Sequence, residues 1–212
     1  MKNITKGTEP HSLTSWRATD PENYADYPDK DGLREHLAGE QCNICCYCMR
    51  RIYPQTGSMK VEHWQSQSTH RHLRLVYSNL LGVCMGGDGC RDADKHCDTF
   101  KGNRSLSRNP ANPVHNVEGL IRYLPDGTIQ ASETVFSGQL ASVLNLNLPF
   151  LRNNRKAVLE SLQKMLAKRG GSLTRIAWEN LIADWNGASG AIDLQPYCGV
   201  VIYWARKHLA RL

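Results

Sequence analysis

The sequence lacks any run of about 18 consecutive apolar residues, the length that a membrane-spanning helix requires. Its first residues, MKNITKGTEP, contain no apolar stretch of the kind found in secretory signals. It also lacks internal repeats and low-complexity tracts. These absences predict a protein of the reducing cytoplasm without a membrane partner. In that compartment, eight cysteines are expected to be metal ligands or buried thiols rather than disulfides.

The composition is that of one soluble globular domain, with 212 residues, 41% hydrophobic and 22% charged. The net charge of +6 is unevenly distributed. Residues 1–40 hold 5 basic and 8 acidic residues, residues 41–110 hold 10 and 5, and residues 111–212 hold 11 and 7. The cysteine- and histidine-rich middle is therefore the basic part. This favours a polyanionic partner such as nucleic acid, although solubility alone could explain a difference of this size.

Local patterns predict a mixed α+β fold. Residues 8–30, which carry three prolines, are expected to form an irregular arm. Residues 31–41, with leucines four apart, predict a short helix with Asp31 as its N-cap. Further elements expected are strands over 50–53 and 59–64, an apolar segment at helical spacing over 73–84 whose 76–77 portion could be extended, and a glycine-rich loop over 85–91.

The second half of the chain has a different texture. Residues 120–129 predict a β-hairpin that turns at Asp126-Gly127. Helices are expected over 133–144, 150–169, 173–185 and 197–210. Three parts follow from these patterns: an arm and short helix over 1–41, a core over 42–115, and a hairpin with a mainly helical part over 116–212. The last two are expected to form one compact unit.

Seven of the eight cysteines lie between Cys42 and Cys97. Cys45 and Cys48 form a Cys-x-x-Cys pair, whose spacing lets two thiolates face one ion, and a tetrahedral zinc site needs two more. We favour Cys84 and Cys97 as the second pair, closing a structural Zn²⁺ site. Two alternatives stay open. Cys42 also forms a Cys-x-x-Cys pair with Cys45, and Cys90 competes in the second half; buried or incidental thiols are the simpler alternative.

Glu62 and His63 adjoin at the end of a predicted strand. Hydrolysis of a phosphodiester needs an activated water and a cation on the phosphate. Imidazole, with an ordinary pKa near 6.5, suits the first task, and a carboxylate suits a hard cation. Alone, a Glu-His pair is weak evidence, because an ordinary surface histidine is the more common case. The motifs around the pair decide whether it is catalytic.

These surroundings contain several motifs in a fixed order. They are Cys-Cys-Tyr-Cys at 45–48, Val61-Glu62-His63-Trp64, Tyr77-Ser78-Asn79-Leu80-Leu81, His96 to Gly102, Asn109-Pro110-Ala111-Asn112-Pro113, residues 121–129, and Leu144-Asn145-Leu146-Asn147. Together they resemble the HNH endonucleases, and more narrowly the PtuB-type HNH nucleases of Septu and retron-linked bacterial defence systems. The resemblance spans about residues 42–155.

The resemblance implies a ββα-metal core that is stabilised by a zinc ion bound to the four cysteines. It makes His63 the general base that activates water, and it makes Glu62 and Asp98 the ligands of Mg²⁺ or another divalent cation. Asn79 would orient the loop and the base by hydrogen bonding. Lys101 would touch the phosphate or a flanking strand.

Two departures from the family pattern matter. A glycine-rich insertion separates Cys84 from Cys97, which leaves Cys90 as a rival ligand and His96 as a rival catalytic residue. The metal-binding position after Cys97 is Asp98 instead of the commoner Asn or His, a change that keeps a good ligand for a hard cation.

Simpler roles are open for several of these residues. Asp98 could cap the following helix, and Lys101 could be a solvated charge. Arg71, Arg74 and Arg104 are predicted to contact nucleic acid, although the first two could equally lie at an ordinary exposed helix start.

The resemblance thus implies an anti-phage effector nuclease that cuts DNA, or structured RNA, together with a PtuA-type ABC ATPase in a hetero-oligomer. The arm and the late helices are candidate docking surfaces. A non-catalytic zinc-binding adaptor on the same scaffold is the main alternative, and Glu62, His63 and Asp98 count against it because an adaptor has no need of them. A Cys-x-x-Cys redox protein is weaker still, since the chain lacks a βαβ pattern.

Overall fold

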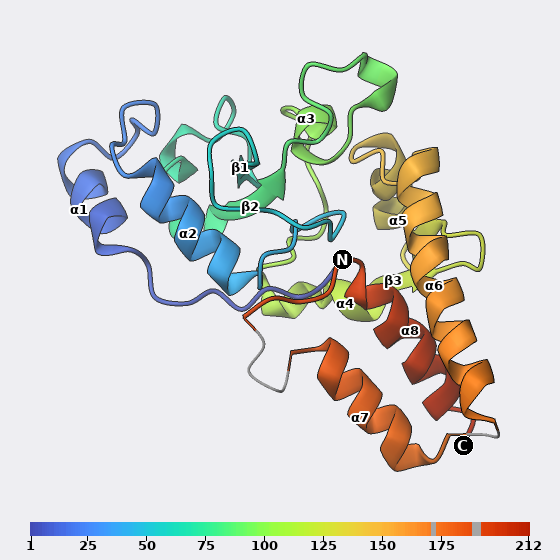
Figure 1. Ribbon diagram of the computed structural model, residues 1–212. Helices are drawn as coiled ribbons and strands as arrows, with labels where there is room; N and C mark the ends of the chain where they lie inside the picture. Colours follow the sequence, from blue (N-terminus) through green and yellow to red (C-terminus); the bar gives the residue numbers. More distant parts are fainter. Residues whose placement is uncertain (171–172, 188–191) are drawn as a thin grey trace.

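A computed structural model describes residues 1–170, 173–187 and 192–212. It has an α+β fold with two small antiparallel sheets, as expected (Figure 1). The elements are α1 (His11–Thr19), α2 (Lys30–Glu40), β1 (Met59–His63), β2 (Leu80–Cys84), α3 (Cys97–Lys101), α4 (Val117–Leu120), β3 (Ile121–Tyr123), β4 (Ile129–Ala131), α5 (Thr134–Ser142), α6 (Pro149–Arg169), α7 (Arg175–Trp185) and α8 (Cys198–Leu209). Among the described residues, no helix is both long and apolar enough to cross a membrane.

The candidate site lies around the β1–β2 pair. The two strands are antiparallel, with Glu62 opposite Leu81 and His63 opposite Leu80. Helix α2 contacts both strands, and α3 contacts β2, so the pair lies between the two helices (Figure 1). All five residues of β2 are buried, which explains its unbroken apolar run.

The N-terminal arm is more ordered than its prolines predict. Helix α1 begins directly after Pro10, where the fixed φ of proline does no damage. Its Leu13 is fully buried in a small hydrophobic cluster with Leu33 and Leu37. One apolar face of this kind is too short to show as periodicity, so the expectation of an irregular arm was wrong over α1.

Three further expectations need correction. The cap of α2 is Asp29, whose side chain accepts a hydrogen bond from the Gly32 N–H, and Asp31 lies in the first turn. Residues 73–84 form short 3₁₀ turns followed by strand β2 instead of a helix, because periodicity alone cannot separate a buried strand from a buried helix. The strand expected over 50–53 is reduced to a single bridge between Ile44 and Arg51.

The C-terminal half agrees with expectation. The hairpin β3–β4 pairs Ile121 with Ala131, and the helices over 134–142, 149–169, 175–185 and 198–209 match the predicted segments closely. Helix α8 packs against α6, α7 and β3. One hydrophobic cluster runs from the cysteines at 45–48 to Val200 and Val201 of α8, so the core is shared across residue 116.

Candidate metal centre and carboxylate–imidazole site

Four cysteine sulfurs converge beneath the β1–β2 pair. The Sγ atoms of Cys45, Cys48, Cys84 and Cys97 all lie within 4.8 Å of one another, and all four residues are buried. The separations are 3.9 Å for Cys45–Cys97, 3.7 Å for Cys48–Cys84 and 3.9 Å for Cys84–Cys97. A tetrahedral zinc with bonds of about 2.3 Å places its sulfurs about 3.8 Å apart. The four thiols therefore fit a zinc ion, as the spacing predicts.

The local backbone turns these sulfurs inward. The Met49 N–H donates to the Cys45 carbonyl and closes a turn over residues 45–49, the cysteine turn. The Cys46 N–H donates to the Gly82 carbonyl of β2 at 3.1 Å, which ties the cysteine turn to the sheet. Met49 has φ 61° and Cys97 has φ 55°. Such conformations cost a non-glycine residue on the order of 1–3 kcal/mol, so the surrounding contacts must hold them.

Burial raises the pKa of Cys48 and Cys97, but Cys45 is shifted toward the thiolate. Burial alone would raise the pKa of Cys45, but hydrogen bonds from neighbouring thiols outweigh it and hold that pKa well below its usual value. The thiolate is the form that binds metal. The rival cysteines lie outside the group: Cys90 is exposed and Cys42 is half-buried.

His96 belongs to the cysteine site. Its ring is 1% exposed, and its Nδ1 lies 3.1 Å from the Cys97 sulfur. The other side of the ring contacts Phe150, with centroids 5.3 Å apart. A histidine that donates to a ligand sulfur stabilises the thiolate form, so the geometry favours this role over a catalytic one.

Above the cysteines lies a buried group of charged side chains. Glu62 and Lys101 are each 1% exposed, and Lys101 Nζ lies 2.9 Å from Glu62 Oε1. Burial and the adjacent Asp98 carboxyl raise the pKa of Glu62 well above its usual value, against the opposing effect of Lys101. Two carboxyls that repel one another in this way favour a cation between them. Together with waters and a phosphate, two carboxylates suffice for Mg²⁺.

His63 is held in one tautomer by the loop that precedes β2. Its Nε2 lies 2.9 Å from the Arg74 carbonyl oxygen. A carbonyl only accepts, so Nε2 carries the proton and Nδ1 keeps the basic lone pair. Burial lowers the pKa of His63 to about 4, so the ring is neutral near pH 7. Asp98 and Lys101 influence both His63 and Glu62, so the four groups lie within electrostatic reach of one another.

Asn79 braces the loop that holds His63. Its Oδ1 accepts from the Gln65 N–H at 2.7 Å, and its Nδ2 donates to the carbonyls of Gln65 and Leu73 at 3.0 and 3.1 Å. The Leu73 carbonyl is one residue before Arg74, which accepts from His63. These bonds brace the loop around the Arg74 carbonyl, and a role of Asn79 in orienting the base stays a prediction.

Two basic residues make hydrogen bonds within the protein. Lys101 points inward to Glu62 and also donates to the His63 carbonyl at 3.2 Å, so it is neither a solvated charge nor open to a phosphate. Arg104 donates to the carbonyls of Lys101, Ser142 and Val143 and stacks on Phe100. These bonds tie the ends of α3 and α5 together. Arg104 itself is exposed, and its contact with nucleic acid stays a prediction.

Residues 20–24 of the arm lie against His63 and the neighbouring arginines. The Tyr24 ring meets the His63 ring edge-on, with centroids 4.6 Å apart. Arg71 pairs with the Glu22 carboxylate at 3.3 Å, and Arg74 donates to the Glu22 carbonyl. Two of the three arginines predicted to contact nucleic acid, Arg71 and Arg74, therefore lie beside the base, but here they contact an acidic segment of the same chain. Nothing in the sequence pattern of residues 20–24 pointed to this cover.

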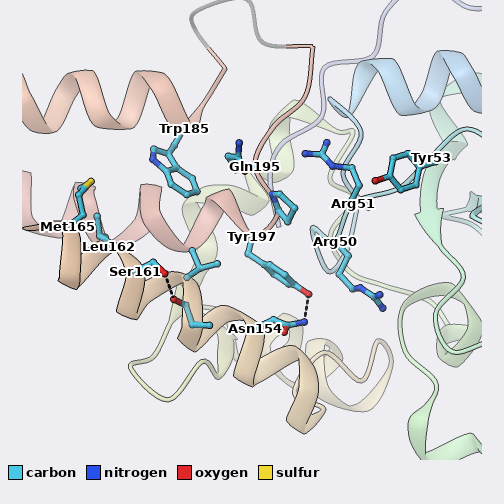
Figure 2. Close-up of a pocket in the computed structure, with 13 residues that line it drawn as sticks. Arg50, Arg51, Tyr53, Asn154, Ser161, Leu162, Met165, Trp185, Gln195 and Tyr197 are labelled. Atoms are coloured by element: carbon cyan, nitrogen blue, oxygen red, sulfur yellow. Dashed lines mark hydrogen bonds between the residues drawn. The ribbon is translucent and has the colours of Figure 1, made fainter.

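A separate cavity of about 730 Å³ lies between α6, α7 and the cysteine turn. Figure 2 shows Arg50 and Arg51 on one wall, facing Trp185, Leu162 and Met165 across the space, with Tyr197 between them. The Tyr197 hydroxyl accepts from Asn154 at 3.0 Å. None of the carboxylate or imidazole groups described above lines this cavity.

Comparison with known proteins agrees with the motifs. No family model matches the chain. The chain is 26% identical over 234 residues to an Escherichia coli protein named "Retron Ec83 putative HNH endonuclease". The similarity covers 88% of this chain and 88% of that protein, so it is not confined to one motif. It supports a relationship to HNH endonucleases and hence to hydrolases, while the narrower PtuB-type resemblance stays a prediction.

Proposed function

We propose that the chain is a metal-dependent endonuclease of the HNH type, built on a ββα-metal core. The observation that carries the proposal is the pairing of a neutral, oriented His63 with the Glu62–Asp98 carboxyl pair. The chemistry that hydrolyses a phosphodiester needs both parts. The name of the retron relative is in agreement.

In this proposal His63 Nδ1 takes a proton from water as its oxygen bonds to phosphorus and the P–O bond to the leaving oxygen breaks. Glu62 and Asp98 would hold Mg²⁺ or a similar cation, which would neutralise charge on the phosphate and the leaving oxygen. Lys101 favours the ionised form of Glu62 against the effects of burial and Asp98, and Asn79 keeps the Arg74 carbonyl in place behind His63. Arg71 and Arg74 would contact the substrate backbone once Glu22 has moved.

The wider role follows the family. We propose DNA as the substrate, a cytoplasmic anti-phage defence system as the setting, and a PtuA-type ABC ATPase as the partner in a hetero-oligomer. A non-catalytic zinc-binding adaptor is the second candidate function. Two observations support it: His63 is only 5% exposed beneath Tyr24, and Lys101 already pairs with Glu62.

The test compares His63→Ala with His36→Ala, which removes an exposed imidazole from α2. Zinc content and Mg²⁺-dependent cleavage of DNA and RNA are measured for each, with and without the ATPase. We expect His63→Ala to lose roughly 10²–10⁴-fold in rate, the usual contribution of a general base, and to keep its zinc. Equal cleavage by both variants would remove His63 as the base, and an inactive wild-type protein that still binds nucleic acid would favour the adaptor.

A further inference from the structure

Tyr47 joins the two metal-binding regions. It lies between Cys46 and Cys48 in the cysteine turn, and its side chain is fully buried. Its hydroxyl donates a hydrogen bond to Glu62 Oε1 at 2.7 Å. A buried tyrosine hydroxyl needs a partner, and here the partner is the carboxylate assigned to the catalytic cation.

The two donors to Glu62 converge on one oxygen. Lys101 Nζ lies 2.9 Å from the same Oε1 that accepts from Tyr47. A carboxylate oxygen has about two lone-pair sites, so Oε1 is fully used. The oxygen left for a cation is Oε2. The rotation of the Glu62 carboxylate is thus set by Tyr47 and Lys101, which follow Cys46 and Cys97 closely in the sequence.

The cysteine turn is itself fixed against the sheet. The Cys46 N–H donates to the Gly82 carbonyl, and Gly82 pairs with Val61, the neighbour of Glu62 in β1. Cys45 and Cys48, on either side of this bond, contribute sulfurs to the four-cysteine group. A metal held there would fix Tyr47 relative to β1.

We propose that Tyr47 is a positioning residue that couples the four-cysteine site to the catalytic cation by orienting Glu62. The proposal rests on the proposed function, because it takes Glu62 as a cation ligand. It adds a residue that the sequence motif contains only as a spacer between cysteines.

The chain offers a matched control in a second tyrosine–glutamate–lysine group. The Tyr77 hydroxyl donates to Glu40 Oε1 at 2.5 Å, and Lys6 Nζ lies 2.7 Å from Glu40 Oε2. Tyr77→Phe removes the same kind of hydrogen bond from a glutamate on α2 that has no part in the proposed chemistry.

The experiment measures Mn²⁺ binding to the zinc-loaded full chain by electron paramagnetic resonance, for wild type, Tyr47→Phe and Tyr77→Phe. Zinc content and the Mg²⁺ dependence of cleavage are measured in parallel. We expect roughly tenfold weaker Mn²⁺ binding for Tyr47→Phe, the effect of losing one hydrogen bond to a charged group, with zinc retained. Half-saturation by Mg²⁺ should rise by a similar factor, and Tyr77→Phe should match wild type in both.

Three results would overturn the proposal: equal Mn²⁺ binding in wild type and Tyr47→Phe, equal weakening in both variants, or loss of zinc or folding in Tyr47→Phe alone. Loss of zinc or folding would show that the role of Tyr47 is purely structural. The Mn²⁺ measurement needs no cleavage, so a wild-type chain that binds Mn²⁺ without cutting nucleic acid would contradict the nuclease and leave the role of Tyr47 testable.

Discussion

Mild acid should destabilise the folded chain through His63. Burial lowers the pKa of this imidazole to about 4 in the folded state, whereas an unfolded histidine titrates near 6.5. Between these values the unfolded chain binds the extra proton and the folded chain does not. Stability is therefore unaffected above about pH 6.5, falls as the pH drops through this window, and levels off below about pH 4.

The size of the effect follows from the gap of about 2.5 pKa units. Each unit corresponds to about 1.4 kcal/mol, so the whole window contributes about 3 kcal/mol. About 1.4 kcal/mol of this should be lost between pH 7.5 and pH 5.5. That is a measurable fraction of the roughly 5–15 kcal/mol typical of a folded protein.

Urea unfolding of wild type and His63→Gln over this pH range isolates the contribution. Glutamine keeps an N–H for the Arg74 carbonyl but does not titrate, and the carboxylates and thiols change equally in both proteins. Zinc content is followed at each pH. We expect the unfolding free energy of wild type to fall more steeply by about 1.4 kcal/mol. Parallel curves for the two proteins would refute the idea that burial holds His63 neutral.

Three further outcomes are expected. Cys84→Ser should lose zinc and roughly 5 kcal/mol or more of stability, because structural zinc sites contribute about 10–16 kcal/mol. Cys90→Ser should keep both its zinc and its stability, as metal analysis and thermal unfolding would show. Asn79→Ala removes three hydrogen bonds from a buried loop and should cost about 3 kcal/mol in urea unfolding together with most of the cleavage activity. Arg155 is 1% exposed and donates to the carbonyls of Gly127 and Leu146, so Arg155→Met should cost about 3 kcal/mol with little change in Mn²⁺ binding.

The cysteine site was predictable because its chemistry restricts the choice of residues. The two thiolates of a Cys-x-x-Cys pair, separated by two residues, can face one ion, and the strands between the two halves bring Cys84 and Cys97 back to them. Spacing alone could not exclude Cys42 or Cys90. What excludes them is the tertiary structure, which buries the other four sulfurs within 4.8 Å of one another and leaves Cys42 half-buried and Cys90 exposed.

Other parts depend on contacts that leave no local pattern. Strand β2 is buried on every residue, so its apolar run resembles a helix as much as a strand. A lysine such as Lys101 is usually exposed, and only the tertiary position of Glu62 turns it inward. Tyr47 and Tyr24 gain their roles from partners 15 and 39 positions away, which no short motif encodes.

The unequal burial of the thiols offers a practical handle on the molecule. The structure describes all eight cysteines, and among them Cys90 alone is exposed. A maleimide dye should therefore label the native protein at a single position in the loop between β2 and α3. Release of the metal would uncover further thiols to the same reagent. A count of labelled positions by mass spectrometry would then report, molecule by molecule, whether the four-cysteine site is intact.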